Sequence, residues 1–435
     1  AVTLLESGRC VLAAQALDSR GDLSDLSERA PELAERFRTL TAEFETDTTS
    51  DRVALAEELD AVTDRIRALP GMERFLRPPL LTDLTAQAHE GPIVYVNVNV
   101  SRHRCDALII TPDGVRSRAL DGLSEENVSR RVRALHTAFT EGRLAAEQTI
   151  HDTLEWLWDT VAGPVLGELG LTTEPPADRP WPRIWWAPVG SLSLLPLHAA
   201  GHHRDGGPVL LDRVVSSTTP TIRALGHARA GRRDDRNEPR MLVVAMPHTP
   251  DAPDLPGAQA EADHLAALLP GATVLVGADA TRDAVLEALP ASGWAHFACH
   301  GYSDPDNPSD SHLALHDHDR APFRVLDLSR LRLRGAEFAF LSACDTARTT
   351  ARLSDEAIHP LAAFQIAGFS QVVGTLWRVD DAVAPDFSRQ IYGELIADRS
   401  GALCASAAVH RTVRRLRTTY PNLPSVWAAH VHAGA

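Results

Sequence analysis

A histidine and a cysteine follow two apolar runs in the second half of the chain. The run W-A-H-F-A-C (294–299) ends at His300 and Gly301, and the run F-A-F-L-S-A (338–343) ends at Cys344. A thiolate is a nucleophile, and imidazole is its natural base near neutral pH. The pair therefore suits acyl transfer, in which a thioester forms and is then hydrolysed.

Acyl transfer through a cysteine also needs donors for the negatively charged intermediate. The backbone N–H groups of Gly301 and Cys344 are suitable candidates for such an oxyanion site. Gly301 has no Cβ, so a substrate can approach its amide closely.

The two runs belong to a regular alternation of strands and helices. Apolar runs predict strands at 241–246, 273–276, 294–300, 337–343 and 370–377, and periodic segments predict helices at 259–269, 281–289, 356–367 and 382–397. Such alternation predicts an α/β domain with a mostly parallel, buried sheet, whose functional residues follow the carboxyl ends of strands. We expect His300 and Cys344 to face each other at that edge.

The other cysteines fit packing better than chemistry. Cys299 precedes His300 on a strand, so its side chain is expected on the opposite face, in the core. Cys10, Cys105 and Cys404 lie in helical or strand patterns and are expected to be structural. Five scattered cysteines do not form a disulfide framework, which favours a reducing compartment such as the cytoplasm.

The first half of the chain has a different pattern. Apolar residues at helical spacing (Leu33, Phe37, Leu40, Phe44; Leu55, Leu59, Val62, Ile66, Leu69) predict an antiparallel helical hairpin. Alternation at 93–100 and the runs that follow predict a β-meander, then helices over 124–171 and a strand at 183–189. The polar stretch 226–240 is expected to be an exposed connector.

These patterns divide the chain into three parts. We expect a helical adaptor at 1–91, a companion α/β subdomain at 92–237 and the catalytic domain at 238–435. A helical pattern begins almost at Ala1, which suggests a fragment of a longer chain whose upstream part could form a repeat array.

Composition excludes several functions. The net charge of −15 disfavours nucleic-acid binding, and 44% hydrophobic with 23% charged residues is ordinary for a globular protein. No apolar segment is long enough to cross a membrane, and neither a signal peptide nor a P-loop motif is visible. We expect no nucleic acid and no membrane as partners.

The motifs H-F-A-C-H-G (296–301) and L-S-A-C-D-T (341–346) resemble the two signatures of the CHAT family of caspase-like cysteine peptidases. Further similar stretches are I-W-W-A-P-V-G-S-L-S-L-L-P-L-H-A-A-G (184–201), L-P-G-A-Q-A-E-A (255–262), V-V-G-T-L-W-R-V-D-D (372–381) and P-S-V-W-A-A-H-V (424–431). The resemblance implies a caspase-like α/β/α sandwich, a His300/Cys344 dyad and relatives that include separase and proteins with tetratricopeptide repeats. On the same grounds, residues 92–237 could be a degenerate copy of the caspase fold.

The resemblance also directs attention to substrate recognition. Metacaspases that prefer basic residues place an acid two positions before the nucleophile, where this chain has Ser342, so such a preference is in doubt. Asp345 is a candidate for holding a cation or for capping the next helix. Trp377, Asp380 and Asp381 are candidates for lining the substrate groove. The alternative is a packed Trp377 with Asp381 capping a helix from Ala382.

Metal sites are not indicated. The stretch Y-S-D-P-D-N-P-S-D-S-H (302–312) fits no calcium-loop spacing and is expected to be a surface loop beside the dyad. The adjacent His202 and His203 lack a second cluster at zinc spacing. We expect neither a metal nor another cofactor.

The sequence thus predicts a regulated bacterial signalling or defence protease. It would cleave a protein substrate as a cysteine endopeptidase, with an upstream repeat domain or a regulatory protein as a possible partner. The alternative is a catalytically silent caspase-like scaffold that relays partner binding.

Overall fold

The structure is a computed structural model that describes residues 1–8, 26–27, 29–46, 52–98, 104–231, 240–302, 310–342, 360–397 and 404–435. In these residues, eleven strands form one sheet in the order β3-β2-β1-β4-β5-β14-β13-β12-β8-β6-β7, and β9, β10 and β11 form a small second sheet. The strands of the large sheet are β1 (Ile93–Asn97), β2 (Asp106–Thr111), β3 (Gly114–Ala119), β4 (Arg183–Pro188), β5 (Val215–Thr218), β6 (Met241–Ala245), β7 (Thr273–Val276), β8 (Trp294–Ala298), β12 (Phe338–Leu341), β13 (Gln371–Thr375) and β14 (His430–Gly434). The small sheet contains β9 (His300–Tyr302), β10 (His312–Ala314) and β11 (Phe323–Arg324).

The large sheet has two halves whose parallel strands run in opposite directions, and β2 and β3 add to β1 in the antiparallel sense at the outer edge. Strands β1, β4, β5 and β14 pair in parallel, as do β13, β12, β8, β6 and β7. The halves meet where β13 pairs with β14 in the antiparallel sense, with Gln371 opposite Gly434 and Thr375 opposite His430. The carboxyl ends of the two halves therefore lie at opposite edges of the sheet.

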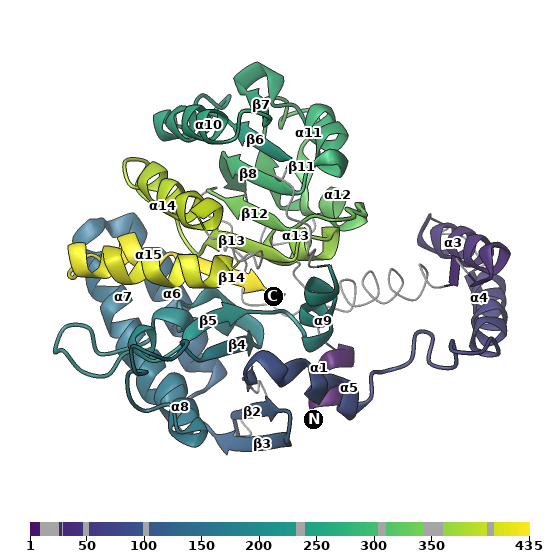
Figure 1. Cartoon of the computed structure of the whole chain (residues 1–435), viewed down its shortest axis with the longest axis horizontal. Coiled ribbons are helices and arrows are strands. Elements are labelled where there is room, and N and C mark those ends of the chain that lie inside the picture. Colours follow the sequence, from purple (N-terminus) through teal and green to yellow (C-terminus); the bar gives the residue numbers. More distant parts are fainter. Residues whose placement is uncertain are drawn as a thin grey trace.

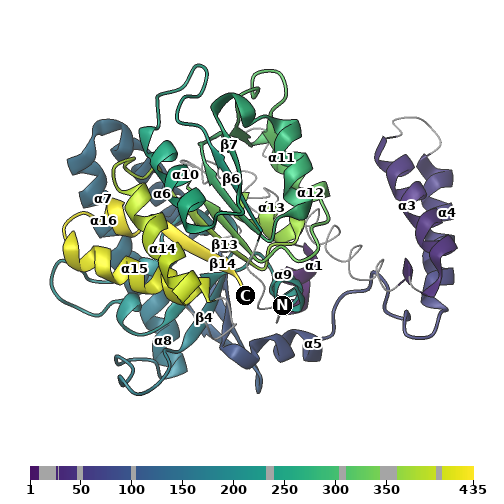
Figure 2. The same ribbon diagram turned by 45° about the horizontal axis from the view of Figure 1, so that its top comes forward.

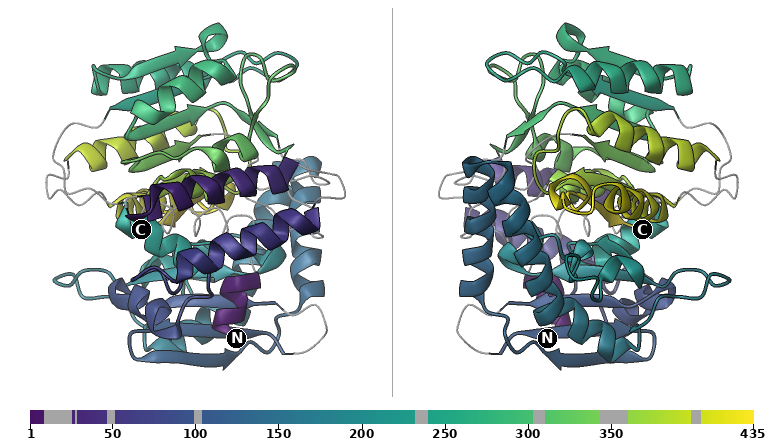
Figure 3. Two further views of the ribbon diagram at one scale, coloured as in Figure 1. Left: turned by 90° about the vertical axis from the view of Figure 1, so that its right-hand side faces the viewer. Right: turned by 90° about the vertical axis from the view of Figure 1, so that its left-hand side faces the viewer.

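Helices cover both faces of this sheet. In Figure 1, α10, α14 and α15 lie on one side of the sheet, and α11, α12, α13 and α9 lie on the other. Figure 3 shows the same layers from two opposite sides. The main helices are α6 (Glu125–Glu141), α7 (Arg143–Leu157), α8 (Gly163–Leu169), α9 (Ile222–Ala230), α10 (Pro256–Leu268), α11 (Arg282–Ala288), α12 (Val325–Arg330), α13 (Pro360–Ala367), α14 (Ala384–Ala397), α15 (Ala405–Thr419) and α16 (Pro424–Trp427). The predicted α/β/α arrangement is confirmed, since buried strands form the middle layer.

The N-terminal helices lie in two places. Helices α3 (Pro31–Thr46) and α4 (Arg52–Arg67) form the predicted antiparallel hairpin, with a core of its own in which Phe37 packs edge-on against Phe75. The hairpin stands apart from the body that contains the sheet (Figures 1 and 2). Helices α1 (Val2–Gly8) and α5 (Leu81–Ala86) instead border the sheet, where Val2 and Leu84 pack against β1 and β4.

The polar stretch 226–240 is not a connector over its whole length. Helix α9 continues to Ala230, with Thr221 accepting the Ala224 N–H at its N-cap. Ile222, Leu225 and Ala228 are buried at three-residue spacing, so one face of α9 packs on the sheet. The prediction was wrong because Leu225 lies just before the polar stretch and Ala228 is a weak apolar signal. Residues 232–239 lie outside the described part of the chain.

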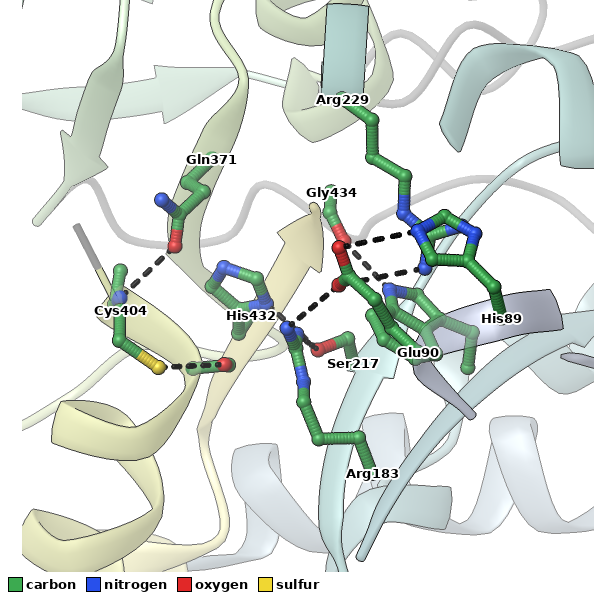
Figure 4. A network of polar contacts seen from close by, with 12 residues as sticks. His89, Glu90, Arg183, Ser217, Arg229, Gln371, Cys404, His432 and Gly434 are labelled. Atoms are coloured by element: carbon green, nitrogen blue, oxygen red, sulfur yellow. Dashed lines mark hydrogen bonds and ion pairs between the residues drawn. The ribbon is translucent and has the colours of Figure 1, made fainter. Parts of the chain in front are cut away.

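A polar cluster strengthens the junction of the two half-sheets. The Glu90 carboxylate lies 3.6 Å from the guanidinium groups of both Arg183 and Arg229 (Figure 4). Both guanidinium groups also stack on the ring of Trp185. The indole N–H of Trp185 donates to the Gly434 carbonyl at 2.7 Å. Because Gly434 pairs with Gln371 at the start of β13, this cluster lies at the sheet edge opposite the carboxyl ends of β8 and β12. Its buried contacts give it a structural role.

Gly368 offers a test of how the chain enters β13. It follows α13 with φ +130°, and a Cβ there would lie 2.3 Å from the Leu333 carbonyl oxygen. We predict that Gly368→Ala lowers the free energy of unfolding by about 1–3 kcal/mol, because the added methyl strains the backbone and forces the carbonyl to move. Urea unfolding followed by circular dichroism measures this loss.

Gly393→Ala is the matched control. Gly393 lies inside α14, where an added Cβ meets no atom within 4 Å, so the variant should be as stable as the wild type or up to about 1 kcal/mol more stable. Equal stability of both variants would contradict the close approach at Gly368.

Candidate active site

The register of two parallel strands determines where the predicted reactive residues leave the sheet. Strand β8 pairs with β12 from Trp294 opposite Phe338 to Phe297 opposite Leu341, and the Ser342 N–H donates to the Phe297 carbonyl at 2.8 Å. Both strands therefore end at the same edge as neighbours, as predicted. Cys344 and Asp345 lie outside the described residues, so the contact between Cys344 and His300 stays a prediction.

The His300 ring is held by the backbone. His300 is buried at the start of β9, and its Nε2 lies 2.7 Å from the Pro253 carbonyl oxygen. A carbonyl oxygen only accepts, so Nε2 carries the proton and Nδ1 keeps a lone pair in the neutral ring. This tautomer leaves Nδ1 as the basic nitrogen. No residue pattern pointed to Pro253, because the contact comes from its main chain.

The neighbouring Gly301 lies in the short strand β9. It pairs with Leu313 of β10, and His300 pairs with Ala314. Pairing with β10 fixes the backbone of both residues beside the end of β8. The Gly301 amide as an oxyanion donor stays a prediction.

A buried carboxylate lies beneath this edge. Glu261 of α10 accepts a hydrogen bond from the Ser342 hydroxyl at 2.9 Å, and its second oxygen lies 3.2 Å from His296 Nε2. His296 Nδ1 contacts the Tyr392 hydroxyl at 3.2 Å. Burial, with the Glu261 charge, raises the pKa of Tyr392 well above its ordinary value, so this phenol stays protonated.

Glu261 was not singled out from the sequence. Its signal was present, since it is the glutamate of L-P-G-A-Q-A-E-A (255–262), one of the stretches that carry the family resemblance. Ser342 occupies the position where an acidic residue would have indicated a preference for basic substrate residues. Its hydroxyl instead donates a hydrogen bond to the carboxylate of Glu261 in α10. The acid missing from the sequence position is therefore present nearby in space.

A small cavity adjoins Ser342. Its volume is about 20 Å³, and it is lined by Leu255, Ala258, Glu261, Ala298, Ser342, Thr375, Val379, Asp381, Ala384 and His430. Asp381 accepts the Gly257 N–H at 2.7 Å, at the start of α10. Burial lowers the pKa of His430 to about 3, so its ring is neutral at pH 7. Glu261 and Asp381 are the charged groups of this lining.

A larger cleft continues from the small cavity. It has a volume of about 750 Å³ and lies between helices α6 and α7 and the segment after β13, where Val379 and Asp381 belong to both linings. Trp377 is buried in its wall, with its indole N–H donating to the Ser425 carbonyl at 2.9 Å and its ring 5.6 Å from Phe139.

The two aspartates after Trp377 have different contacts. Asp380 is exposed and accepts the Ala382 N–H at 3.1 Å, so it, and not Asp381, caps the turn before α14. Asp381 instead bonds to the start of α10. The structure thus brings Trp377, Asp380 and Asp381 together in one wall of the cleft, and their contact with substrate stays a prediction.

The remaining candidates have ordinary structural contacts. Cys299 is fully buried in the main core, as predicted, and Cys105 is also buried. His202 pairs with Asp159, and His203 contacts the Ala199 carbonyl. Across the described ranges, no three His, Cys, Asp or Glu side chains gather as a metal site would require, and no helix is long and apolar enough to span a membrane.

The fold and this edge define a caspase-like α/β protein. The structure is similar to two Saccharomyces cerevisiae separase–securin complexes, with TM-scores of 0.57 and 0.55, identities of 10% and 12%, and coverage of 81% of this chain and 30% of the other. A complex of Porphyromonas gingivalis RgpB pro- and mature domains matches with a TM-score of 0.40 at 10% identity, over 71% of this chain and 76% of that one. The chain spans about 30% of the length of the separases it matches.

The sequence family is more specific than the fold. The model of the CHAT domain matches residues 151–435, which is more than half of the chain, and the chain belongs to this family. No curated protein matches significantly. Residues 151–435 include both predicted reactive residues and all of the cavity lining described above.

The neutral His430 ring gives a test of the environment at this edge. It is fully buried and stacks on Phe387 at a centroid distance of 3.5 Å. Because its folded pKa of about 3 lies below the unfolded value, the unfolded state binds more protons between pH 6.5 and 3, and stability falls as the pH falls through that window. From pH 7 to pH 5, His430 should contribute a loss of up to about 2 kcal/mol.

The test compares wild type with His430→Phe, which keeps a stacked ring that cannot titrate. Urea unfolding at pH 7 and pH 5 should show a smaller acid-induced loss in the variant. Other buried histidines, among them His198 and His410, also titrate at low pH, so the wild-type loss should be reduced and not abolished. The same pH dependence in both proteins would contradict the neutral state of His430.

Proposed function

We propose that this chain is a cysteine endopeptidase in which His300 and Cys344 act as a dyad. The supporting observation is the parallel register of β8 and β12, which makes the segments leading to both residues neighbours at one edge. The Pro253 carbonyl adds a second support, because it holds the His300 ring with Nδ1 as the base. Membership of the CHAT family, with its caspase-like fold, fits the same chemistry.

The proposed reaction follows from these groups. Nδ1 of His300 takes the thiol proton of Cys344 while sulfur attacks the peptide carbonyl, and the N–H groups of Gly301 and Cys344 stabilise the oxyanion. The imidazolium then returns the proton to the leaving amine. Water, deprotonated by the same ring, hydrolyses the thioester and regenerates the thiol.

The acidic lining of the cavity beside Ser342 favours substrates that have a basic residue on the acyl side of the cleaved bond. Its charged groups are the carboxylates of Glu261 and Asp381, and the buried His430 ring in its wall is neutral. A cation there would gain charge-assisted hydrogen bonds, whereas an acidic side chain would meet like charges. The present volume of about 20 Å³ requires the wall to open when a side chain enters.

The proposal extends to the rest of the chain. The cleft of about 750 Å³, with Trp377 and Asp380 in its wall, would take substrate residues further upstream. Asp345 follows the nucleophile and would help hold an incoming cation. The division of the chain would be a helical adaptor at 1–91, a companion subdomain at 92–237, which could be a pseudo-caspase, and a protease domain at 238–435.

A regulated bacterial signalling or defence role in the cytoplasm is part of the same proposal. The solved separases are complexes with securin, a protein partner, and this chain would respond in a similar way to an upstream repeat domain or a regulatory protein. The hairpin of α3 and α4 stands apart from the body that contains the sheet, so its surface would be available to such a partner (Figure 2).

A catalytically silent scaffold remains the second candidate. It is favoured by the closely packed state of the cavity, which would need to open for a substrate side chain. An electrophilic peptide probe that labels the wild type but not Cys344→Ala would exclude the silent scaffold.

Removal of either dyad residue tests the proposal directly. We predict that Cys344→Ala or His300→Ala lowers kcat/KM for a cleaved peptide by at least about 1,000-fold, because nucleophile and base act as one unit. Cleavage of a peptide library followed by mass spectrometry measures the loss. Cys299→Ala, which removes a buried core thiol, is the matched control and should keep activity. Full activity in Cys344→Ala would reject the mechanism.

The acidic cavity gives a prediction on specificity. Peptides with Arg on the acyl side of the cleaved bond should be cleaved at least about 10-fold faster than the same peptides with Glu. Asp381→Asn should reduce kcat/KM for the Arg peptide by about 10-fold, since a charge-assisted bond becomes a neutral one. Asp386→Asn, an exposed aspartate of α14 outside the linings of both the cavity and the cleft, should change this value little. A preference for Glu would contradict the assignment of the cavity.

A further inference from the structure

Two aromatic rings on the small sheet and a third, His318, from the turn after β10 lie together near His300. Tyr302 follows His300 by two positions on β9 and pairs with His312 of β10. The ring centroids of Tyr302, His312 and His318 lie 5.3, 6.0 and 6.2 Å apart, with interplanar angles of 17–28°. The stretch 302–312 is thus not a surface loop at its two ends, because Tyr302 and His312 are paired strand residues.

The three rings form a compact cluster and not a column. In a face-to-face column the outer rings would be about twice as far apart as neighbours, whereas here all three separations are nearly equal. Each ring therefore stacks on the other two with its centre displaced sideways. We call this cluster, made of Tyr302, His312 and His318, the ring platform.

The ring platform is held in place before any ligand arrives. His312 Nδ1 donates to the Asp310 carbonyl at 3.1 Å, and His318 Nε2 lies 3.2 Å from the Pro250 carbonyl. Burial lowers the pKa of His312, so its ring is neutral at pH 7. Tyr302 is 42% exposed, so part of the platform is accessible to solvent and offers an aromatic ring for stacking.

The position of the ring platform relates it to the scissile bond. Residues two apart on a strand share a face, so the side chains of Tyr302 and His300 lie on the same side of the small sheet, about 6.5 Å apart along the strand. This distance corresponds to about two residues of an extended peptide. The loop after β6 contacts both, through Pro253 to His300 and Pro250 to His318.

The direction along the edge follows from the strand order. The cleft lies beyond the end of β13, and the acidic cavity is lined by the ends of β8, β12 and β13 and by α10. The platform follows β8 in the chain and contacts the loop after β6. A peptide whose acyl side enters the cavity and whose carbonyl meets His300 would have its leaving-group side toward the platform.

We propose that the ring platform is a subsite for an aromatic side chain at the first or second residue after the cleaved bond. This inference rests on the proposed peptidase function. It adds the substrate class on the leaving-group side, where an aromatic ring stacks on the cluster of Tyr302, His312 and His318.

The test uses peptides with a fixed acyl side and either Phe or Ala at each of the two downstream positions. Stacking predicts a three- to ten-fold higher kcat/KM for Phe at one of these positions. Tyr302→Phe should keep this preference, and Tyr302→Ala should remove it without changing the preference for Arg over Glu on the acyl side. The matched control is Tyr420→Ala. Tyr420 is 39% exposed and follows the last residue of α15, so this variant should keep both preferences.

The outcomes separate the two proposals. Cleavage with no downstream preference, or a preference that survives Tyr302→Ala, overturns the subsite and leaves the peptidase intact. Cleavage of no peptide by the wild type counts against the peptidase. In that case fluorescence anisotropy with Cys344→Ala still decides the subsite. Three- to ten-fold tighter binding of the Phe peptides, lost in the Cys344→Ala/Tyr302→Ala double variant, supports it, and equal binding overturns it.

Discussion

The parallel pairing of β8 with β12 is the constraint on which the rest of the site depends. A shift of β12 by one residue would move Ser342 away from Glu261 and exchange the side chains that face the two helical layers. The pairing is strongly specified, because both strands are buried on both faces between helical layers. Burial of these strands and the hydrogen bonds between their backbones thus define this edge without any contribution from polar side chains.

Polar contacts then fix what lies at that edge. The Glu261 carboxylate in α10 contacts Ser342, which follows β12, and His296 in β8. One buried carboxylate therefore fixes the relative positions of three elements, which apolar packing alone would hold less firmly. Burying a carboxylate costs free energy unless its oxygens accept hydrogen bonds or pair with a cation. Loss of either partner would leave part of this buried charge unpaired. The Pro253 carbonyl has a similar effect on the His300 ring. Such a ring needs no acidic third residue to fix its tautomer.

The alternation of strands and helices could be predicted because each strand of the second half is a short apolar run between periodic segments. The end of β8 shortly before His300 and the end of β12 just before Ser342 follow from the same pattern, whereas the start of a new strand, β9, at His300 does not. Glu261 could not be assigned, since its partners lie 35 and 81 positions away in the sequence and meet it only in the folded chain. Strand β14 was also missed, because H-V-H-A-G is short and half polar, yet it joins the two half-sheets. Trp377 shows a further limit: its type suggested stacking on substrate, but burial and the bond to Ser425 decide its position.

The two half-sheets use their carboxyl edges differently. Around His300 the edge is lined by a cavity, a cleft and the ring platform. At the opposite edge, beyond β5, the chain's own Glu6 occupies the corresponding place. Its buried carboxylate accepts the Ile222 N–H at 2.6 Å and contacts Tyr95 and Arg223 at the start of α9. A helix N-terminus next to a strand end attracts an anion, and here α1 supplies it. The companion half thus uses the same physical feature to anchor the upstream helix.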